Sequence, residues 1–469
     1  MKDLSIIFDC GATNVRVVAI NSRGSIESLE SFPNSTKEDP ETPGGRIWDL
    51  DEIWDKFCKA SKLVMSQIDT SRICGVSVTT FGADGAFLNE KDELMYPVVS
   101  WQCERTAPVM QNIGKYISLQ DIYHETGVFP YNFNTVAKLI WFKENRPDII
   151  PNDSRFLFMP SLIHLKLGGE GINDATMLGT GMITNIETRD CSEKVFQAID
   201  VDPALFGPLT EPGENVGVVD PRASERTGLP ENTPLIASGH DTQFAIVGSG
   251  AGVNQPVLSS GTWEILMCRS RDCTCTNREL DLGITTELDA EPGMYDIGIN
   301  YMGSGTLEWI KRHFFPFDDY ETMVREAEAV PPGSDGVRVK TDFYNAKDTG
   351  PAGGIEGLTL QTTRGHIFRA ALEGLSLKMK DALRAVEKAG RFQASSVICV
   401  GGGSKNDLWN RIRADVCGVP VTTIDQKETT VLGAAMFVFK GTGVVESLDE
   451  ARGNIDYSPV VYHPSGDFV

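Results

Sequence analysis

The segment LIASGHDTQFAIVGSG (residues 235–250) stands near the middle of the chain and interrupts an apolar stretch with polar groups. Residues 235–239 are typical of a buried strand and residues 244–247 of a buried helix. The polar residues between them are His240, Asp241, Thr242 and Gln243. If Asp241 starts the helix, the helix dipole favours the charged carboxylate that a general base needs. A helix N-cap has the same placement, and for an isolated aspartate capping is favoured by about three to one.

The parts of the chain on either side of this segment have similar sizes and share one order of predicted elements. In the first part we expect strands and a helix in the order strand 4–8, strand 14–20, strand 25–32, helix 49–68 and strand 73–81. In the second part we expect a strand–turn–strand unit at 256–268, strand 294–300, strand 396–400, helix 407–418, strand 419–424 and helix 428–439. The pattern predicts an α/β fold of two related domains, residues 1–245 and 246–469, which face each other across a cleft.

The composition is that of a globular protein, with 41% apolar and 23% charged residues. The formal net charge of −22 argues against nucleic acid or an anionic membrane as a partner, because both attract basic surfaces. A nucleotide is not excluded, since it needs only a few amide donors and one or two cations. The longest apolar run is too short to cross a bilayer, and the N-terminus does not read as a signal peptide. The ten cysteines show no zinc-site spacing, so we expect a reducing cytoplasmic location without a structural metal.

The first motif, DCGATNVR (residues 9–16), is a turn between two predicted strands. Gly11 and Thr13 can direct backbone N–H groups and a hydroxyl at a phosphate. Asp9 could hold Mg²⁺, through water because magnesium keeps much of its hydration, and Arg16 could reach a phosphate oxygen. A tight hairpin with a capping aspartate explains this motif about equally well.

Two further glycine-containing turns occur in the second part. LSSGTWE (258–264) repeats the small polar turn, with Thr262 as a hydroxyl donor, and CVGGGSKNDLW (399–409) brings backbone close to a flat or anionic ligand. The competing explanation for the latter is helix initiation, because Ser404 and Asp407 have the spacing of a capping box. Neither the P-loop nor the Rossmann fingerprint is present.

In their order along the chain, these four motifs resemble those of the FGGY carbohydrate kinases of the actin/hexokinase-like ATPase superfamily. The resemblance covers essentially the whole chain and includes TTFGADGA (79–86), SGHDTQFA (238–245), VLSSGTWEILM (257–267) and TTRGHIFRAALEGL (362–375). It implies two RNase H-like domains that bind ATP and Mg²⁺ in the cleft between them and close on binding.

The resemblance also assigns roles to individual residues. Asp241 matches the catalytic aspartate and Asp9 the metal residue. The positions that match nucleotide-binding residues are Gly11, Thr13, Asn14, Arg16, Thr262, Glu308, Gly402, Gly403 and Asn406. The positions expected to contact the sugar are Gly82, His240, Asp241, Thr242 and Asn300.

Departures from the family pattern narrow the substrate. The Arg-Glu pair of glycerol kinases is absent at TTFGAD (79–84), and WQCER (101–105) has Cys103 where an acid is usual, so no sugar contact is carried onto it. The expected reaction is ATP-dependent phosphorylation of a 6-deoxyketose, L-fuculose, at its C1 hydroxyl, with L-rhamnulose, D-ribulose and L-xylulose as alternatives. A non-catalytic actin-like ATPase switch and a glycosidase with paired carboxylates are the other classes weighed. The oligomeric state stays open, a homodimer included.

Overall fold

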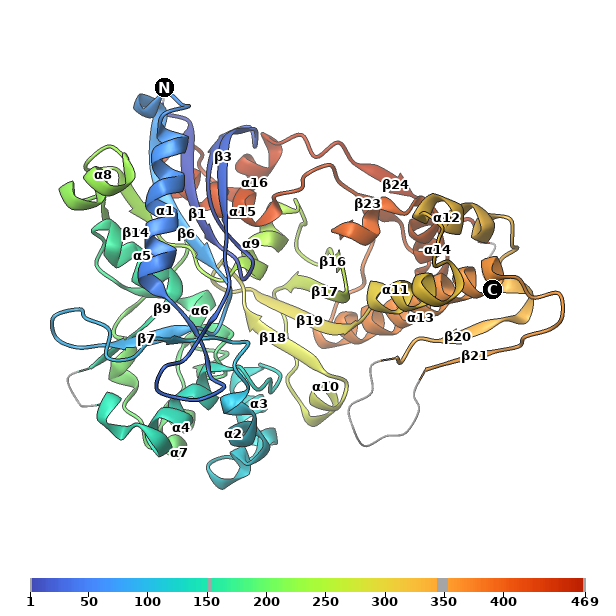
Figure 1. The fold of residues 1–469 in the computed structure, drawn as a ribbon, viewed down its shortest axis with the longest axis horizontal. Coiled ribbons are helices and arrows are strands. Elements are labelled where there is room, and N and C mark those ends of the chain that lie inside the picture. Colours follow the sequence, from blue (N-terminus) through green and yellow to red (C-terminus); the bar gives the residue numbers. More distant parts are fainter. Residues whose placement is uncertain (1, 151–153, 344–352, 467–469) are drawn as a thin grey trace.

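Two mixed β-sheets, one from each half of the chain, organise the computed structural model, which describes residues 2–150, 154–343 and 353–466. Figure 1 shows them in two lobes, with α9 (Asp241–Gly248) between. The first sheet contains, in spatial order, β14 (Asn215–Val218), β15 (Pro234–Ile236), β6 (Ile73–Thr80), β1 (Leu4–Cys10), β2 (Asn14–Asn21) and β3 (Ile26–Pro33). The second contains β18 (Ile284–Leu288), β19 (Tyr295–Met302), β17 (Trp263–Ser270), β16 (Val257–Ser260), β22 (Val397–Val400), β23 (Val421–Thr423) and β24 (Val460–Tyr462).

The two sheets share one core topology. Strand β1 pairs antiparallel with β2 and parallel with β6, and these pair onward with β3 and β15. Strand β16 likewise pairs antiparallel with β17 and parallel with β22, which pair onward with β19 and β23. The predicted repeat of strand–turn–strand units is therefore confirmed, as two related α/β domains.

The central strands β1 and β6 of the first sheet are buried on both faces, which explains their nearly continuous apolar sequence. Ile6 and Phe8 of β1 pack in the same core as α1 (Leu50–Met65), α5 (Met159–Leu167) and α8 (Pro221–Thr227). Ile7 points to the opposite face, in a core shared with α9, α15 (Thr429–Gly441) and α16 (Leu448–Gly453). Because α15 and α16 stand between β23 and β24 in the sequence, the chain returns to the first domain there and then rejoins the second sheet.

The division into residues 1–245 and 246–469 stays a prediction. Its boundary falls inside α9, and two helices of the second part pack on the first sheet. The join between the domains is thus made by two chain segments, α9 and α15, which pack against each other.

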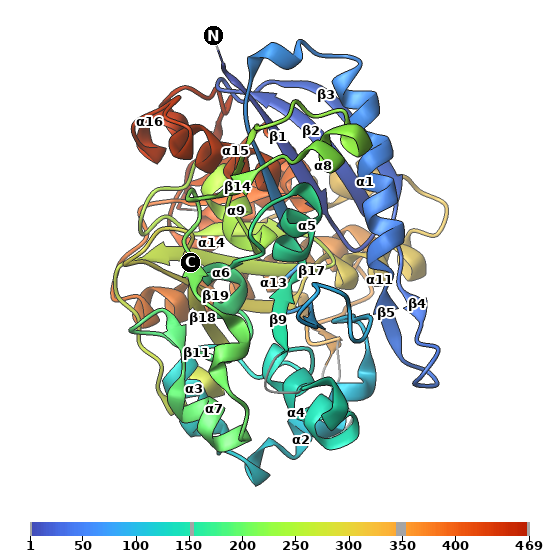
Figure 2. The same cartoon turned by 90° about the vertical axis from the view of Figure 1, so that its left-hand side faces the viewer.

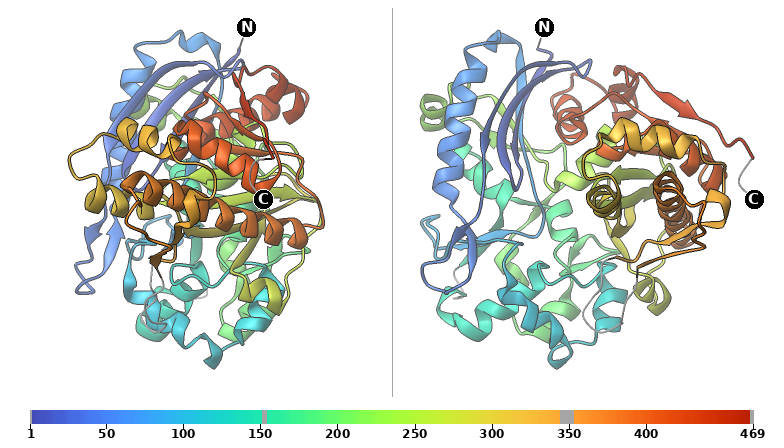
Figure 3. Two further views of the ribbon diagram at one scale, coloured as in Figure 1. Left: turned by 90° about the vertical axis from the view of Figure 1, so that its right-hand side faces the viewer. Right: turned by 45° about the vertical axis from the view of Figure 1, so that its right-hand side comes forward.

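The remaining elements form a helical part below the first sheet and a cover over the second. The helical part, seen in Figure 2, contains α2 (Ala107–Gln111), α3 (Leu119–Thr126), α4 (Thr135–Asn145), α6 (Ala175–Gly179), α7 (Glu193–Ile199), β7 (Gly85–Leu88) and β9 (Arg155–Phe158). The second sheet is flanked, as Figure 3 shows in yellow to orange, by α10 (Asn277–Asp281), α11 (Ser304–Phe314), α12 (Tyr320–Glu328), α13 (Arg364–Ala389) and α14 (Asp407–Cys417). The short strands are β4 (Lys37–Glu38), β5 (Arg46–Trp48), β8 (Val98–Val99), β10 (Asn173–Asp174), β11 (Thr184–Asn185), β12 (Asp190–Cys191), β13 (Leu209–Thr210), β20 (Arg338–Lys340) and β21 (Gly354–Glu356).

Within the described ranges no helix has the length and apolarity to cross a membrane, and all ten cysteines are free thiols.

Asp296 of β19 is a fully buried carboxyl group in the second sheet. No donor in the described part of the chain is hydrogen-bonded to either of its oxygen atoms. The nearby Arg269 instead binds Asp289 through Nε (2.7 Å) and Nη2 (2.9 Å). Burial, followed by the charge of Asp289, raises the pKa of Asp296 well above its usual range, so the fold favours the neutral form of this carboxyl group.

Replacing Asp296 by asparagine should therefore stabilise the fold at neutral and alkaline pH. A carboxyl whose pKa is raised on folding has no cost below its unfolded pKa near 4, and the cost grows as the pH rises towards the folded pKa. The amide has no such cost, so the free energy of unfolding should rise by at least about 1.4 kcal/mol at pH 8, the equivalent of one pKa unit. Urea unfolding at pH 4 and pH 8 measures this difference. An equal gain at both pH values, or no gain at pH 8, would contradict the assignment.

Candidate active site

The first predicted phosphate loop is the tight turn between β1 and β2. The Gly11 N–H donates to Asn14 O (2.8 Å), and Asn34 Nδ2 donates to Gly11 O (2.9 Å). Thr13 and Asn14 are exposed at the tip, where Asn14 Nδ2 donates to Thr13 Oγ1 (3.1 Å). The hydrogen bond from Asn34 thus fixes the backbone of the loop, and the polar side chains at its tip stay accessible.

Asp9 and Arg16 lie opposite each other on the strands that flank this turn. Arg16 donates through Nε to Asp9 Oδ2 (2.9 Å) and through Nη1 to Glu428 Oε2 (2.5 Å), just before α15. Burial raises the pKa of Asp9 to about 6; Arg16 opposes this change, and the charges of Asp241 and Glu428 add to it. The predicted metal residue and the predicted base are therefore within electrostatic reach of each other.

The second predicted phosphate loop, Gly261–Thr262, joins β16 to β17 and rests on the start of α11. Ser304 donates to Gly261 O through its N–H (3.0 Å) and its Oγ (2.6 Å). The Gly303 N–H donates to Thr262 O (3.0 Å). Hydrogen bonds from residues 303 and 304 therefore fix the backbone of this loop.

A buried ion pair ties this hairpin to the glycine loop after β22. Arg413 of α14 binds Glu264 of β17 (3.0 Å), and Ser260 Oγ donates to the same carboxylate (2.6 Å). Gly403 packs so closely on Ser260 that a Cβ would collide with the serine hydroxyl. A glycine is therefore required there for the loop to approach β16.

The predicted adenine-end residues line one cavity of about 690 Å³. Glu308, Gly402, Gly403 and Asn406 all belong to its wall, together with Gly261 of the second phosphate loop. Its other lining residues include Tyr320, Val324, Arg325, Trp409 and Arg411. The structure thus brings together residues of the β16–β17 turn, α11, α12 and the glycine loop, which are far apart in the sequence.

The helix after the glycine loop is not capped as the capping-box spacing of Ser404 and Asp407 suggested. The N-cap of α14 is Asn406, whose Oδ1 accepts from the Trp409 N–H (3.1 Å), while Ser404 Oγ donates to Gly401 O (2.7 Å). Asn406 therefore holds the cavity wall in shape through its side-chain oxygen.

A second cavity of about 680 Å³ lies on the other side of the glycine loop and reaches Asp241 and Thr242. Gly402 and Lys405 belong to both cavities, so the glycine loop separates them. The apolar part of its wall consists of Ala245, Ile246, Val257, Ile265, Met267, Val400 and Ile424. Asp241 thus lines a cavity whose walls come from α9, the second sheet, the glycine loop and the start of α15.

Asp241 is the first residue of α9, and His240 is the N-cap. The explanation of Asp241 as a helix cap is therefore wrong. Its Oδ1 accepts from Thr242 Oγ1 (3.4 Å), and 33% of its side chain is exposed. Burial within the cleft raises the pKa of Asp241, and the positive charge of His240 opposes this change. Because a third of the side chain is exposed and it does not cap the helix, the carboxylate is accessible to a substrate.

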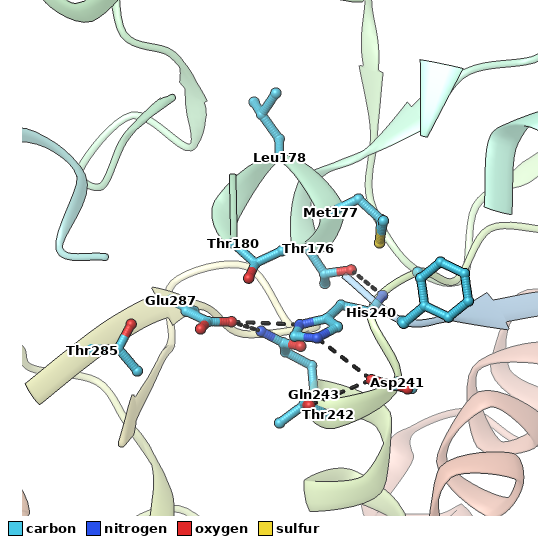
Figure 4. A network of polar contacts seen from close by, with 12 residues as sticks. Thr176, Met177, Leu178, Thr180, His240, Asp241, Thr242, Gln243, Thr285 and Glu287 are labelled. Atoms are coloured by element: carbon cyan, nitrogen blue, oxygen red, sulfur yellow. Dashed lines mark hydrogen bonds and ion pairs between the residues drawn. The ribbon is translucent and has the colours of Figure 1, made fainter. Parts of the chain in front are cut away.

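The His240 imidazole lies between two carboxylates (Figure 4). Its Nε2 is 3.5 Å from Asp241 Oδ1, and its Nδ1 is 3.5 Å from Glu287 Oε2. Gln243 Nε2 donates to the same Glu287 oxygen (2.7 Å), and the His240 N–H donates to Thr176 Oγ1 (3.0 Å). Burial lowers the pKa of His240, but the contact with Glu287 and the charge of Asp241 outweigh it, so the pKa is raised.

Two further predicted sugar residues are Gly82, which contacts this imidazole, and Asn300, which binds Tyr131. Gly82 abuts the ring, because a Cβ there would stand 2.8 Å from His240 Nε2. Asn300 of β19 is exposed and donates through Nδ2 to Tyr131 Oη (3.1 Å). Burial and then the charge of Glu287 raise the pKa of Tyr131 to about 12, which places Tyr131 near the same network.

Three residues that the sequence analysis did not single out contact the predicted site. Glu428 binds Arg16, Glu287 contacts His240, and Tyr131 accepts from Asn300. None stands in a recognisable motif. The one available signal is an acid inside the run ITTEL (284–288), whose pattern is otherwise that of a buried strand.

Asp84 and Cys103, which stand in the segments TTFGADGA and WQCER, have structural roles. Asp84 is fully buried, where it pairs with Lys138 and accepts from Trp48 Nε1 (2.7 Å). The Cys103 thiol is also buried and accepts from Arg105 Nε (3.0 Å). Cys103 therefore faces the protein interior.

Comparisons with known proteins agree with this architecture. The sequence profile described as "FGGY family of carbohydrate kinases, N-terminal domain" matches residues 4–248, and that of the C-terminal domain matches residues 257–440. L-fuculokinase of Escherichia coli K12 is 42% identical over 464 residues, which cover 99% of this chain and 98% of that protein. L-fuculokinase of Haemophilus influenzae is 40% identical, covering 96% and 97%, and rhamnulokinase of Bacteroides thetaiotaomicron is 26% identical, covering 99% and 96%.

Solved structures share the fold. Xylulose kinase from Rhodospirillum rubrum superposes with a TM-score of 0.88 at 19% identity, covering 99% of this chain and 95% of that one. Plasmodium falciparum glycerol kinase with ADP superposes with a TM-score of 0.86 at 18% identity, covering 98% and 94%. With two matching profiles and relatives above 40% identity along its length, the chain belongs to the FGGY family of carbohydrate kinases.

Proposed function

We propose that this kinase transfers the γ-phosphoryl group of ATP to the C1 hydroxyl of L-fuculose, giving L-fuculose 1-phosphate and ADP. The observation that carries the chemistry is the Asp241 carboxylate, which is accessible, does not cap its helix and lines the second cavity. The sugar is supported by the relatives named L-fuculokinase, at 40–42% identity over nearly the full chain. A rhamnulokinase at 26% identity supports L-rhamnulose much less.

Asp241 acts as the general base in this proposal. The C1 oxygen forms a bond to the γ-phosphorus, the bond from that phosphorus to the bridging oxygen of ADP breaks, and the hydroxyl proton passes to Asp241 Oδ. Because such transfers have loose transition states, positioning and charge neutralisation supply most of the acceleration. Arg16 and the backbone amides of the two hairpin turns are the groups placed to stabilise phosphate charge.

Mg²⁺ fits the residues around the first hairpin. Asp9 is a buried carboxylate beside Arg16, and Mg²⁺ is usually held by one or two carboxylates together with phosphate oxygens and water. When bound, the ion neutralises charge on the phosphate groups. Asp9 is the residue that would hold it.

Replacing Arg16 by alanine should weaken ATP more than sugar. The guanidinium lies at the first hairpin, bound to Asp9 and Glu428, and no described contact joins it to His240 or Gly82. Loss of one charge-assisted phosphate contact is expected to raise the KM for ATP by about tenfold, with a much smaller change for the sugar. Steady-state kinetics with each substrate varied in turn measure both constants. An equal loss for the two substrates would contradict the phosphate assignment.

A coupled kinase assay tests the proposed function. ADP release is followed with L-fuculose, L-rhamnulose, D-ribulose and L-xylulose, and with no sugar as the control. The proposal requires the highest kcat/KM with L-fuculose and little ADP release without sugar. Preference for another ketose would overturn the sugar, and ATP hydrolysis that no sugar stimulates would overturn the kinase assignment in favour of an ATPase switch.

A further inference from the structure

Glu287 belongs to the second sheet but reaches into the catalytic segment at the start of α9. Its carboxylate is 3.5 Å from His240 Nδ1 and accepts from Gln243 Nε2 (2.7 Å). The side chains of His240 and Glu287 are only 13% and 10% exposed, and Figure 4 shows the glutamate directed at the imidazole. A carboxylate this deeply buried needs polar partners: Gln243 supplies a hydrogen bond, and His240 lies within ion-pair distance.

The strand that carries Glu287 is fixed to the helical part of the first domain. Tyr123 Oη donates to Ile284 O (2.9 Å), and the Thr286 N–H donates to Gly127 O (2.8 Å). The Phe129 N–H donates to Thr285 Oγ1 (3.2 Å). Edge strand β18 is therefore anchored residue by residue, and the position of Glu287 beside His240 is built into the fold.

The imidazole is held from the other side as well. Gly82 leaves no space for a side chain against the ring, and the backbone N–H of His240 is bound to Thr176 Oγ1 (3.0 Å). Each ring nitrogen consequently faces one carboxylate, Nδ1 facing Glu287 and Nε2 facing Asp241 at 3.5 Å. An imidazole with an anion at each nitrogen is most stable as the doubly protonated cation.

We propose that Glu287 is a positioning residue: it holds His240 protonated against Asp241, and the resulting imidazolium keeps the Asp241 carboxylate ionised for proton transfer. The inference rests on the proposed function, because it concerns the base of that reaction. Three carboxylates act on His240, namely Glu287 from β18, Asp241 from α9 and Asp174 from the start of α6. For Asp241 the charge of His240 opposes the effect of burial, and Glu287 acts on it directly only as a weaker repulsion.

Removing the charge of Glu287 should therefore shift the pH dependence of catalysis. In Glu287→Gln, His240 loses one of its anions and its pKa falls, so the positive charge beside Asp241 is weakened and the pKa of Asp241 rises. The acidic limb of the kcat/KM profile should move up by about one pH unit, which lowers kcat/KM by about tenfold at pH values below the limb and leaves it nearly unchanged well above it. A purely structural role of Glu287 would lower activity without moving this limb.

The test uses two readouts on the full-length protein. The first is the pH titration of ¹⁵N-labelled imidazoles without sugar or nucleotide, with the His240 signal among six histidines assigned by its loss in His240→Gln. The second is the pH profile of kcat/KM for wild type, Glu287→Gln, Glu287→Asp and the control Glu291→Gln. Glu291 stands in the turn between β18 and β19, and its carboxylate binds Arg269. Glu287→Asp and Glu291→Gln should keep the wild-type acidic limb.

The expected result is a wild-type His240 that titrates above pH 6.5 and a Glu287→Gln protein in which both this titration falls and the acidic limb rises. A wild-type His240 that titrates below pH 6.5, or an acidic limb unmoved in Glu287→Gln, overturns the inference. The wild-type titration decides the question even if Glu287→Gln does not fold. Failure of the wild type to phosphorylate any ketose instead counts against the proposed function, and the imidazole titration still reports on the pair.

Discussion

Replacing Asp241 by asparagine should lower kcat by about 10²–10⁴-fold, the usual contribution of a positioned general base. Asparagine keeps the shape of the side chain but cannot accept the proton of the sugar hydroxyl. Because Asp241 does not cap α9, the helix and the second cavity should be preserved. The Kd for ATP, measured by titration calorimetry, should therefore stay nearly unchanged while turnover is lost.

A matched control for this variant is Asp425→Asn. Asp425 lines the same cavity as Asp241 but stands outside the His240 network. Its replacement should leave kcat close to that of the wild type. An Asp241→Asn enzyme with wild-type turnover would remove Asp241 from the mechanism, and equal losses in the two variants would point to the cavity charge as a whole.

Replacing Lys138 by methionine should destabilise the protein by about 3–5 kcal/mol, the usual result of breaking a buried ion pair from one side. Lys138 is 2% exposed and Asp84 is fully buried. Methionine leaves the Asp84 carboxylate with hydrogen bonds from Trp48 and Trp101 but without a counter-charge. Urea unfolding followed by circular dichroism measures the loss.

The control for this variant lies on the same helix. Lys143 of α4 pairs with Asp200, whose side chain is 90% exposed, so Lys143→Met should cost only a small fraction of the loss in Lys138→Met. The double variant Asp84→Asn/Lys138→Met should recover part of the stability, because it removes the uncompensated charge. Equal losses in Lys138→Met and Lys143→Met would contradict this account of the buried pair.

Much of the fold could be predicted because its strands are buried on both faces. Runs such as 4–8 and 396–400 are apolar except for one serine each, and the structure has β1 and β22 there. The course of the C-terminal helices could not be predicted in the same way. An apolar helix such as α15 shows by its composition that it is buried, but not in which domain, and it packs on the first sheet.

The site was predictable to the extent that its residues stand in turns between strong elements. Asp9, Arg16, Asp241 and Thr262 occupy such turns or strand ends, where short motifs carry information. Glu287 could not be predicted as a site residue. It reaches the site because β18 pairs with β19 and packs on the helical part of the first domain, and both are long-range contacts. The sequence alone could not decide whether Asp241 is a helix cap or a base. The N-cap and the first residue of a helix differ by one position, which a sequence pattern does not resolve.

The most direct test of the central claim is identification of the product. The protein is incubated with ATP, Mg²⁺ and L-fuculose, and the products are examined by ³¹P and ¹H NMR. The account predicts one sugar phosphate, formed in equal amount to ADP, whose phosphorus couples to the two C1 protons. ADP formed without a sugar phosphate, or a phosphorus coupled to protons at another carbon, would contradict it.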